Sequence, residues 1–89
     1  MAFTYDPNDL GKHLNWIRLR IGDIDTTDQQ IQDEEINAHL AVEPRAEFAA
    51  ANVAEAIAVR YARVGAAVES ETYLALADAI RKEATPTYI

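Results

Sequence analysis

The sequence predicts an all-α fold, a small four-helix bundle-like domain over residues 1–84 followed by an extended C-terminal tail over 85–89. Apolar residues recur at steps of three and four, as on one face of an amphipathic helix. No two alternating apolar runs flank a hairpin turn, so no sheet is expected. Hydrophobic residues make up 49% of the 89 positions, but many are alanine. We therefore expect one domain with a thin core that gains part of its burial from neighbouring subunits.

The first helix is expected over Pro7–Ile21, because Asp6 and Pro7 supply a cap residue and then proline at the first helical position. Gly22 can end this helix in a left-handed conformation. The acidic stretch 23–28 that follows favours turns, since its short polar side chains bond nearby backbone. The core face of this helix is expected to carry Leu10, Leu14, Ile17 and Ile21.

A second helix is expected over Asp33–Val42. Ile31 and Ile36 bracket Gln32 as a hydrophobic staple at its start, and Pro44 stops it. The third and longest helix is expected over Arg45–Val64. Its core face is expected to carry Ala50, Val53, Ala54, Ile57, Tyr61 and Val64.

A fourth helix is expected to begin near Ser70, which we interpret as its cap. Pro86 blocks further helix, so the segment after Ala84 should be extended. Tyr88 and Ile89 could then anchor against another chain, although a frayed end is an equally good interpretation. The expected core face of the fourth helix comprises Tyr73, Leu74, Leu76, Ala77 and Ile80.

The polar side of the third helix carries two apolar residues, Phe48 and Val59, beside Asn52 and Glu55. Two such residues on one polar face suggest a contact strip with another subunit or protein. The alternative is that the second or fourth helix packs there, which would make this face part of the core.

Little in the composition favours catalysis or cofactor chemistry. The chain has no cysteine and a net charge of −7, which argues against thiolate metal sites and against holding nucleic acid through its phosphates. Asp23–Asp28 begins like a calcium loop but has Asp28 where the sharp-turn glycine belongs. His13 and His39 lie on different predicted helices with no third ligand at a recognisable spacing. We expect no enzyme activity, cofactor, metal site, membrane span or secretory leader.

A family resemblance covers about residues 7 to 83. Its elements are an arginine-rich helix end, an Ile21-Gly22-Asp23 turn, an aspartate–threonine loop and the helix opening Ile31-Gln32-Asp33-Glu34-Glu35-Ile36. Phe48 then leads an alanine-rich helix that ends in Tyr61-Ala62-Arg63, and a short helix with Tyr73, Leu76 and Arg81 follows. This pattern resembles the small head–tail connector proteins of long-tailed bacteriophages, which are also called adaptor or head-completion proteins.

The resemblance implies a structural virion protein that assembles in the host cytoplasm. Copies would form a dodecameric ring below the portal protein, extend the DNA channel and offer an attachment surface to the next tail or neck component. Double-stranded DNA would pass without sequence-specific binding, because carboxylates repel phosphates. The subunit or portal interface would include the contact strip and the tail: Phe48, Asn52, Glu55, Val59, Tyr88 and Ile89.

Two other classes stay open on the sequence alone. One is an acidic helical protein-binding module, such as a DNA mimic or a partner of a regulator. The other is a helical partner of the toxin–antitoxin or chaperone type. The sequence leaves open the phage and tail type, the exact copy number, whether the ring precedes portal docking, the face that lines the channel and the role of the acidic loop 23–28.

Overall fold

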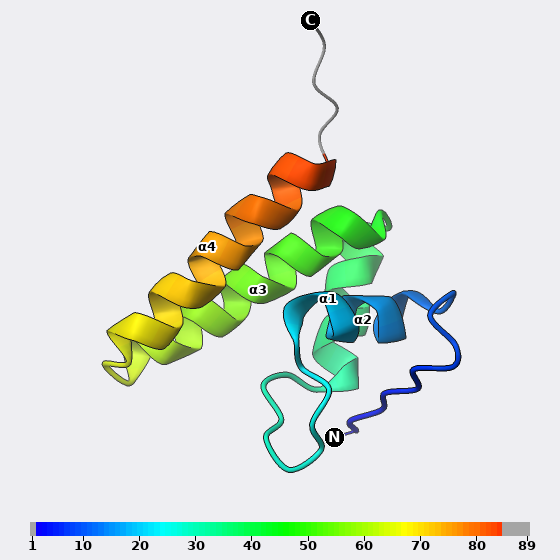
Figure 1. Ribbon diagram of the computed structural model, residues 1–89, viewed down its shortest axis with the longest axis horizontal. Helices are drawn as coiled ribbons and strands as arrows, with labels where there is room; N and C mark the ends of the chain where they lie inside the picture. Colours follow the sequence, from blue (N-terminus) through cyan, green and yellow to red (C-terminus); the bar gives the residue numbers. More distant parts are fainter. Residues whose placement is uncertain (1, 85–89) are drawn as a thin grey trace, which may run out of the picture.

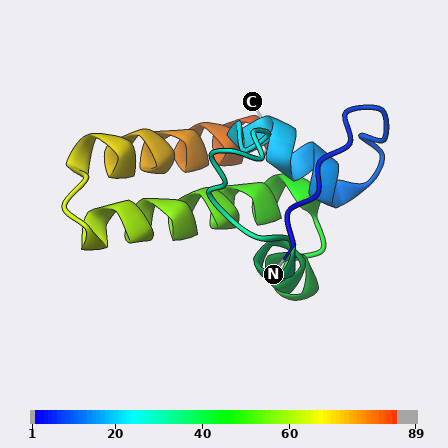
Figure 2. The same cartoon turned by 90° about the horizontal axis from the view of Figure 1, so that it is seen from below.

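The computed structural model describes residues 2–84, which form four α-helices and contain no strand (Figure 1). The all-α prediction is confirmed, whereas the predicted tail lies outside the described residues. α3 and α4 form an antiparallel hairpin, and α1 and α2 pack against α3 at the end of the hairpin away from its turn (Figures 1 and 2). The helices are α1 (His13–Ile21), α2 (Asp33–Val42), α3 (Ala46–Arg63) and α4 (Ala67–Ala84).

α1 begins later than predicted, at His13 instead of Pro7. The Asp6 carboxylate accepts the backbone N–H of Asn8 at 2.9 Å, so the predicted helix cap instead forms a local turn. A second turn follows, in which the Lys12 N–H donates to the Asp9 carbonyl at 3.3 Å. Leu10 therefore lies outside the helix and is 38% exposed, so its predicted core position is wrong.

The end of α1 follows the prediction. Gly22 has a φ of 78°, a left-handed conformation that glycine adopts without a Cβ penalty. The Asp23 N–H reaches back to the Arg18 carbonyl at 3.0 Å, which satisfies one of the last open carbonyls of the helix. The chain then turns into the acidic loop and on to α2.

α2 has the bounds that the sequence predicts. The two staple residues, Ile31 and Ile36, are fully buried. Gln32 occupies the cap position but its side chain does not cap the helix, and the Asp33 N–H instead donates to the Ala2 carbonyl at 2.7 Å. The first residues of the chain thus supply part of the cap of α2.

The hairpin is joined through alanines and a few larger side chains. Tyr61 and Tyr73 stack across it with their ring centroids 5.8 Å apart. Because alanine adds little bulk, the two helices can approach closely along much of their length. The main buried cluster draws on all four helices and the loop before α2, and it comprises Leu14, Ile17, Ile21, Ile31, Ile36, Ala49, Ala50, Ala51, Val53, Ala54, Ile57, Ala77 and Ile80.

α4 begins at Ala67, so Ser70 lies inside the helix and is not its cap. Its hydroxyl donates to the Ala58 carbonyl at 2.9 Å and so links α4 to α3. Two predicted core residues are exposed, Val64 at 77% and Leu74 at 49%. The physical reason is that the hairpin extends beyond α1 and α2, so its outer part has no helix to cover it (Figure 2).

Candidate interaction surface

The four strip residues predicted on α3 share one side of that helix, and we call this side, together with the adjoining side of α4, the open face. Phe48 and the core residue Ile57 lie about two and a half turns apart, which places them on opposite sides of the helix. The open face therefore points away from the core packed against α1 and α2. Tyr88 and Ile89 lie outside the described residues.

Asn52 and Glu55 are engaged by α4. The Arg81 guanidinium forms an ion pair with the Glu55 carboxylate and donates a second bond to the Asn52 side-chain oxygen at 2.9 Å. The side chains of Arg81 and Glu55 are 37% and 43% exposed, so solvent screens the pair and limits its contribution to stability. These residues link the two helices and remain accessible from outside.

Phe48 lies at the base of the open face, near the start of α3. It is half-buried and does not belong to the buried core cluster or to the partly buried residues that pack on it. The Arg45 guanidinium lies over its ring, 4.3 Å from the centroid, and also pairs with the Glu43 carboxylate. The result is an aromatic side chain carrying a cation at the edge of the molecule.

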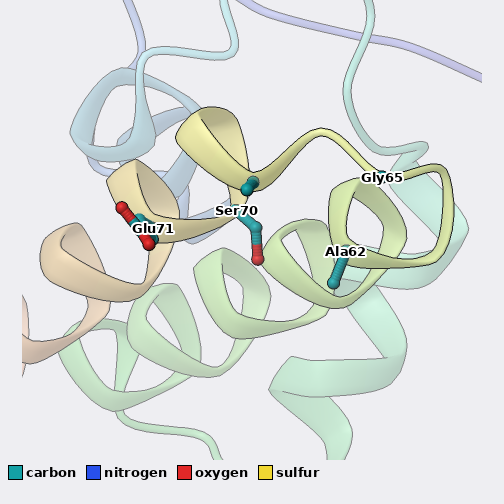
Figure 3. A pocket seen from close by; sticks show the side chains of 5 residues that line it. Ala62, Gly65, Ser70 and Glu71 are labelled. Atoms are coloured by element: carbon teal, nitrogen blue, oxygen red, sulfur yellow. The ribbon is translucent and has the colours of Figure 1, made fainter.

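The other end of the open face is apolar and hollowed. Val59 on α3 is 49% exposed, and Leu74 on α4 is exposed to the same extent. A shallow pocket of about 250 Å³ lies near the hairpin turn (Figure 3). Its lining is Ala62, Gly65, Ala67, Ser70 and Glu71. Sequence reasoning missed this pocket, because it depends on how α4 lies against α3.

Of the residues that the structure describes, Glu71 is the only acidic one that lines the pocket. Among residues 2–84, no basic side chain forms an ion pair with it. The Ser70 hydroxyl is directed at α3, as the close view shows, and its bond to the Ala58 carbonyl occupies it. The pocket therefore offers small apolar walls and one carboxylate to a bound group.

A buried ion cluster holds the opposite part of the molecule together. Arg18 is fully buried and pairs with Asp23 at 2.8 Å and with Asp33 at 2.6 Å. Two further N–H groups of Arg18 donate to the carbonyls of Thr4 at 2.8 Å and Ile31 at 3.0 Å. One side chain thus connects α1, the acidic loop, α2 and the N-terminal segment.

The N-terminal segment, residues 2–6, covers this cluster. The Phe3 ring lies against the Arg18 guanidinium, with 3.7 Å from Cζ to the ring centroid. The Thr4 backbone N–H and hydroxyl both donate to the Asp33 carboxylate, at 2.9 and 2.6 Å. The Ala2 N–H donates to the Glu34 carboxylate at 2.8 Å. These contacts give two of the three acids in the first turn of α2, Asp33 and Glu34, defined partners.

The two cluster carboxyls titrate differently. Burial raises the pKa of Asp23 above its ordinary value, although bonds from the backbone N–H groups of Gln30 and Ile31 and the charge of Arg18 act the other way. For Asp33 burial also acts upward, but bonds from Thr4 and Arg18 outweigh it and lower the pKa. Asp23 is thus the costlier of the two charges to keep buried.

The rest of the acidic loop shows the turn chemistry that the sequence predicts. The Asp25 carboxylate accepts the backbone N–H of Thr27 at 2.9 Å and its hydroxyl at 2.7 Å. These bonds lower the pKa of Asp25. Within the described part of the chain, no three His, Asp or Glu side chains are grouped to hold a metal ion. None of the helices in residues 2–84 has the length and apolarity needed to cross a bilayer.

Comparison with protein-family models, curated proteins and solved structures finds no match to this chain.

Proposed function

We propose that the protein is a structural head–tail connector of a long-tailed bacteriophage and has no enzymatic role. In this proposal, copies form a dodecameric ring below the portal protein. The ring extends the DNA channel and provides the surface to which the next tail or neck component attaches. The proposal starts from the resemblance that covers about residues 7 to 83.

The observation that carries the proposal is the convergence of the resemblance pattern on one buried site. The arginine-rich helix end contributes Arg18, the turn after Ile21 contributes Asp23, and the helix opening contributes Asp33. Residues that are scattered in the pattern thus meet through ion pairs in three dimensions. The pattern therefore includes one set of interacting residues in this fold and is more than a series of independent helical positions.

The surface also suits a ring component. A thin-cored helical protein gains stability from subunit contacts, and the open face leaves Val59 and Leu74 half-exposed for such contacts. The net charge of −7 suits a channel lining past which DNA must slide, since carboxylates do not neutralise phosphates. Head-to-tail contacts that close on themselves would satisfy every copy in the ring.

The experiment is mass spectrometry of purified virions of the phage that encodes the protein, followed by cryo-electron microscopy of the portal vertex. We expect multiple copies arranged as a ring between the portal and the next component. Absence of the protein from purified virions would refute the proposal. A monomer that binds a basic protein but no portal would favour an acidic binding module instead.

Two variants probe the predicted interface residues. Phe48→Asp is expected to weaken ring assembly, because it removes the aromatic ring and introduces a charge that the contact would have to bury. Deletion of residues 86–89, which removes Tyr88 and Ile89, should leave the melting temperature of the monomer unchanged and reduce incorporation into virions. If Phe48→Asp unfolds the isolated monomer, or if the truncated protein is incorporated normally, the corresponding interface assignment is wrong.

A further inference from the structure

The open face carries complementary features at its two ends. At its base, Phe48 lies outside the core with the Arg45 guanidinium 4.3 Å from its ring centroid. Near the hairpin turn, the pocket of about 250 Å³ has small apolar walls and the Glu71 carboxylate. The volume is sufficient for a benzyl side chain. The Arg45 guanidinium beside the ring, which also pairs with Glu43 of its own chain, would meet the Glu71 carboxylate beside the pocket.

The middle of the open face also complements itself. Glu55 lies about halfway along α3 between Phe48 and the pocket residue Ala62, which are separated by about 21 Å along the helix axis. Here Arg81 crosses from α4 and pairs with Glu55. A second copy turned by a half rotation about this point would bring another Glu55–Arg81 pair against the first. Each arginine could then reach either carboxylate.

We propose that two copies of this chain pair antiparallel through their open faces, with Phe48 of each copy in the pocket of the other. Arg45 of each copy then approaches Glu71 of the other. The arrangement is isologous, so each favourable contact occurs twice. This dimer would be a form of the free protein, because a cyclic ring of many copies is built from head-to-tail contacts between two different surfaces. This inference does not depend on the connector function.

The tip of the hairpin is accessible to such a partner. α1 and α2 pack at the other end of the hairpin, as both ribbon views show (Figures 1 and 2). Val59 and Leu74, which lie on the open face, would pass from half-exposed to buried. Burial of this apolar area would supply the affinity, and the charges would set the antiparallel orientation.

The test is analytical ultracentrifugation of the purified chain across a concentration series. The wild type should sediment as a monomer–dimer equilibrium. Glu71→Arg places like charges opposite Arg45 and should weaken the dimer by about tenfold or more. Glu69→Arg is the matched control, because Glu69 is exposed about 200° around α4 from Glu71 and should leave the equilibrium unchanged.

The decisive variant is the double exchange of Glu71→Arg with Arg45→Glu, which restores opposite charges across the proposed interface. It should recover most of the affinity that Glu71→Arg loses. The same solutions are checked by circular dichroism, so that a loss of folding is not taken for a loss of pairing. The proposal would be overturned by a wild type that stays monomeric, or by equal effects of Glu71→Arg and its control Glu69→Arg. It would also be overturned if the double variant recovered no affinity. A ring without a dimer would overturn it as well, while supporting the connector function.

Discussion

Replacing Arg18 by leucine should destabilise the protein more than any surface change, because this side chain neutralises two carboxylates at once. Arg18 and Asp23 both have fully buried side chains, while that of Asp33 is 14% exposed. Leucine keeps much of the apolar contact but supplies no hydrogen-bond donor. Asp23 would then hold its charge with only two backbone N–H groups, from Gln30 and Ile31, as partners.

The expected loss of unfolding free energy follows from the burial of the Arg18 ion pairs. Removing one partner of a buried ion pair typically costs about 3–5 kcal/mol, because the remaining charge is uncompensated. A chain of 89 residues has a total unfolding free energy of about 4–13 kcal/mol at ordinary values per residue. The variant should therefore lose a large share of its stability, and at the low end of this range it would not fold.

The assay is urea unfolding at neutral pH, followed by helical circular dichroism. The control is Arg20→Leu, because the pair between Arg20 and Glu83 has side chains 29% and 67% exposed and should contribute less than about 1 kcal/mol. Adding Asp23→Asn to Arg18→Leu should recover part of the loss, since a neutral amide leaves no unpaired charge. A cost of Arg18→Leu no larger than that of Arg20→Leu would refute the reasoning.

Three further predictions concern single positions. Asp33→Asn should lower the unfolding free energy at neutral pH, and this loss relative to the wild type should shrink below pH 3.8. The folded-state pKa of Asp33 is lowered from 3.8, so the carboxylate stabilises the fold above that pH and stops doing so as the pH falls through the folded-state pKa. A loss that stays constant with pH would contradict this. Ser70→Ala should cost about 0.5–1.5 kcal/mol in urea unfolding through loss of its bond to the Ala58 carbonyl, and an unchanged midpoint would mean that this bond contributes nothing. Gly22→Ala should cost about 1–2 kcal/mol, because its φ of 78° is strained for a residue with a Cβ, and a thermal melt equal to the wild type would argue against that conformation in solution.

Local sequence signals predicted the helices best where both ends carry chemical markers. α2 has three acids in its first turn, an apolar staple before it and Pro44 after it, and its bounds agree with the prediction. The start of α1 was wrong because Asp6 and Pro7 are equally suited to a turn, and the bond from Asn8 to Asp6 decides for the turn. The residue types at these two positions do not by themselves distinguish the start of a helix from a turn.

The buried ion cluster was harder to foresee, since its members lie on separate segments of the chain. A sign was present: Arg18 is four residues after Leu14 and three before Ile21, which places it on the buried face of α1. The partners of Arg18 could not be chosen from the sequence, because the acidic loop and the start of α2 offer several carboxylates. For the candidate surface, the shared face of Phe48 and Val59 followed from helical spacing, whereas the pocket required the relative placement of α3 and α4.

The division of contacts along the chain also bears on how the protein folds. The Arg18 cluster and the N-terminal segment join residues within the first half of the chain, and the hairpin joins α3 to α4 within the second. Contacts this close in sequence need little loop closure, so the hairpin should form early and quickly. The cluster must bury its charges together, and we expect it to form late. Amide hydrogen exchange should then be slowest in the middle of α3 and faster over residues 2–6, where opening breaks mainly surface hydrogen bonds.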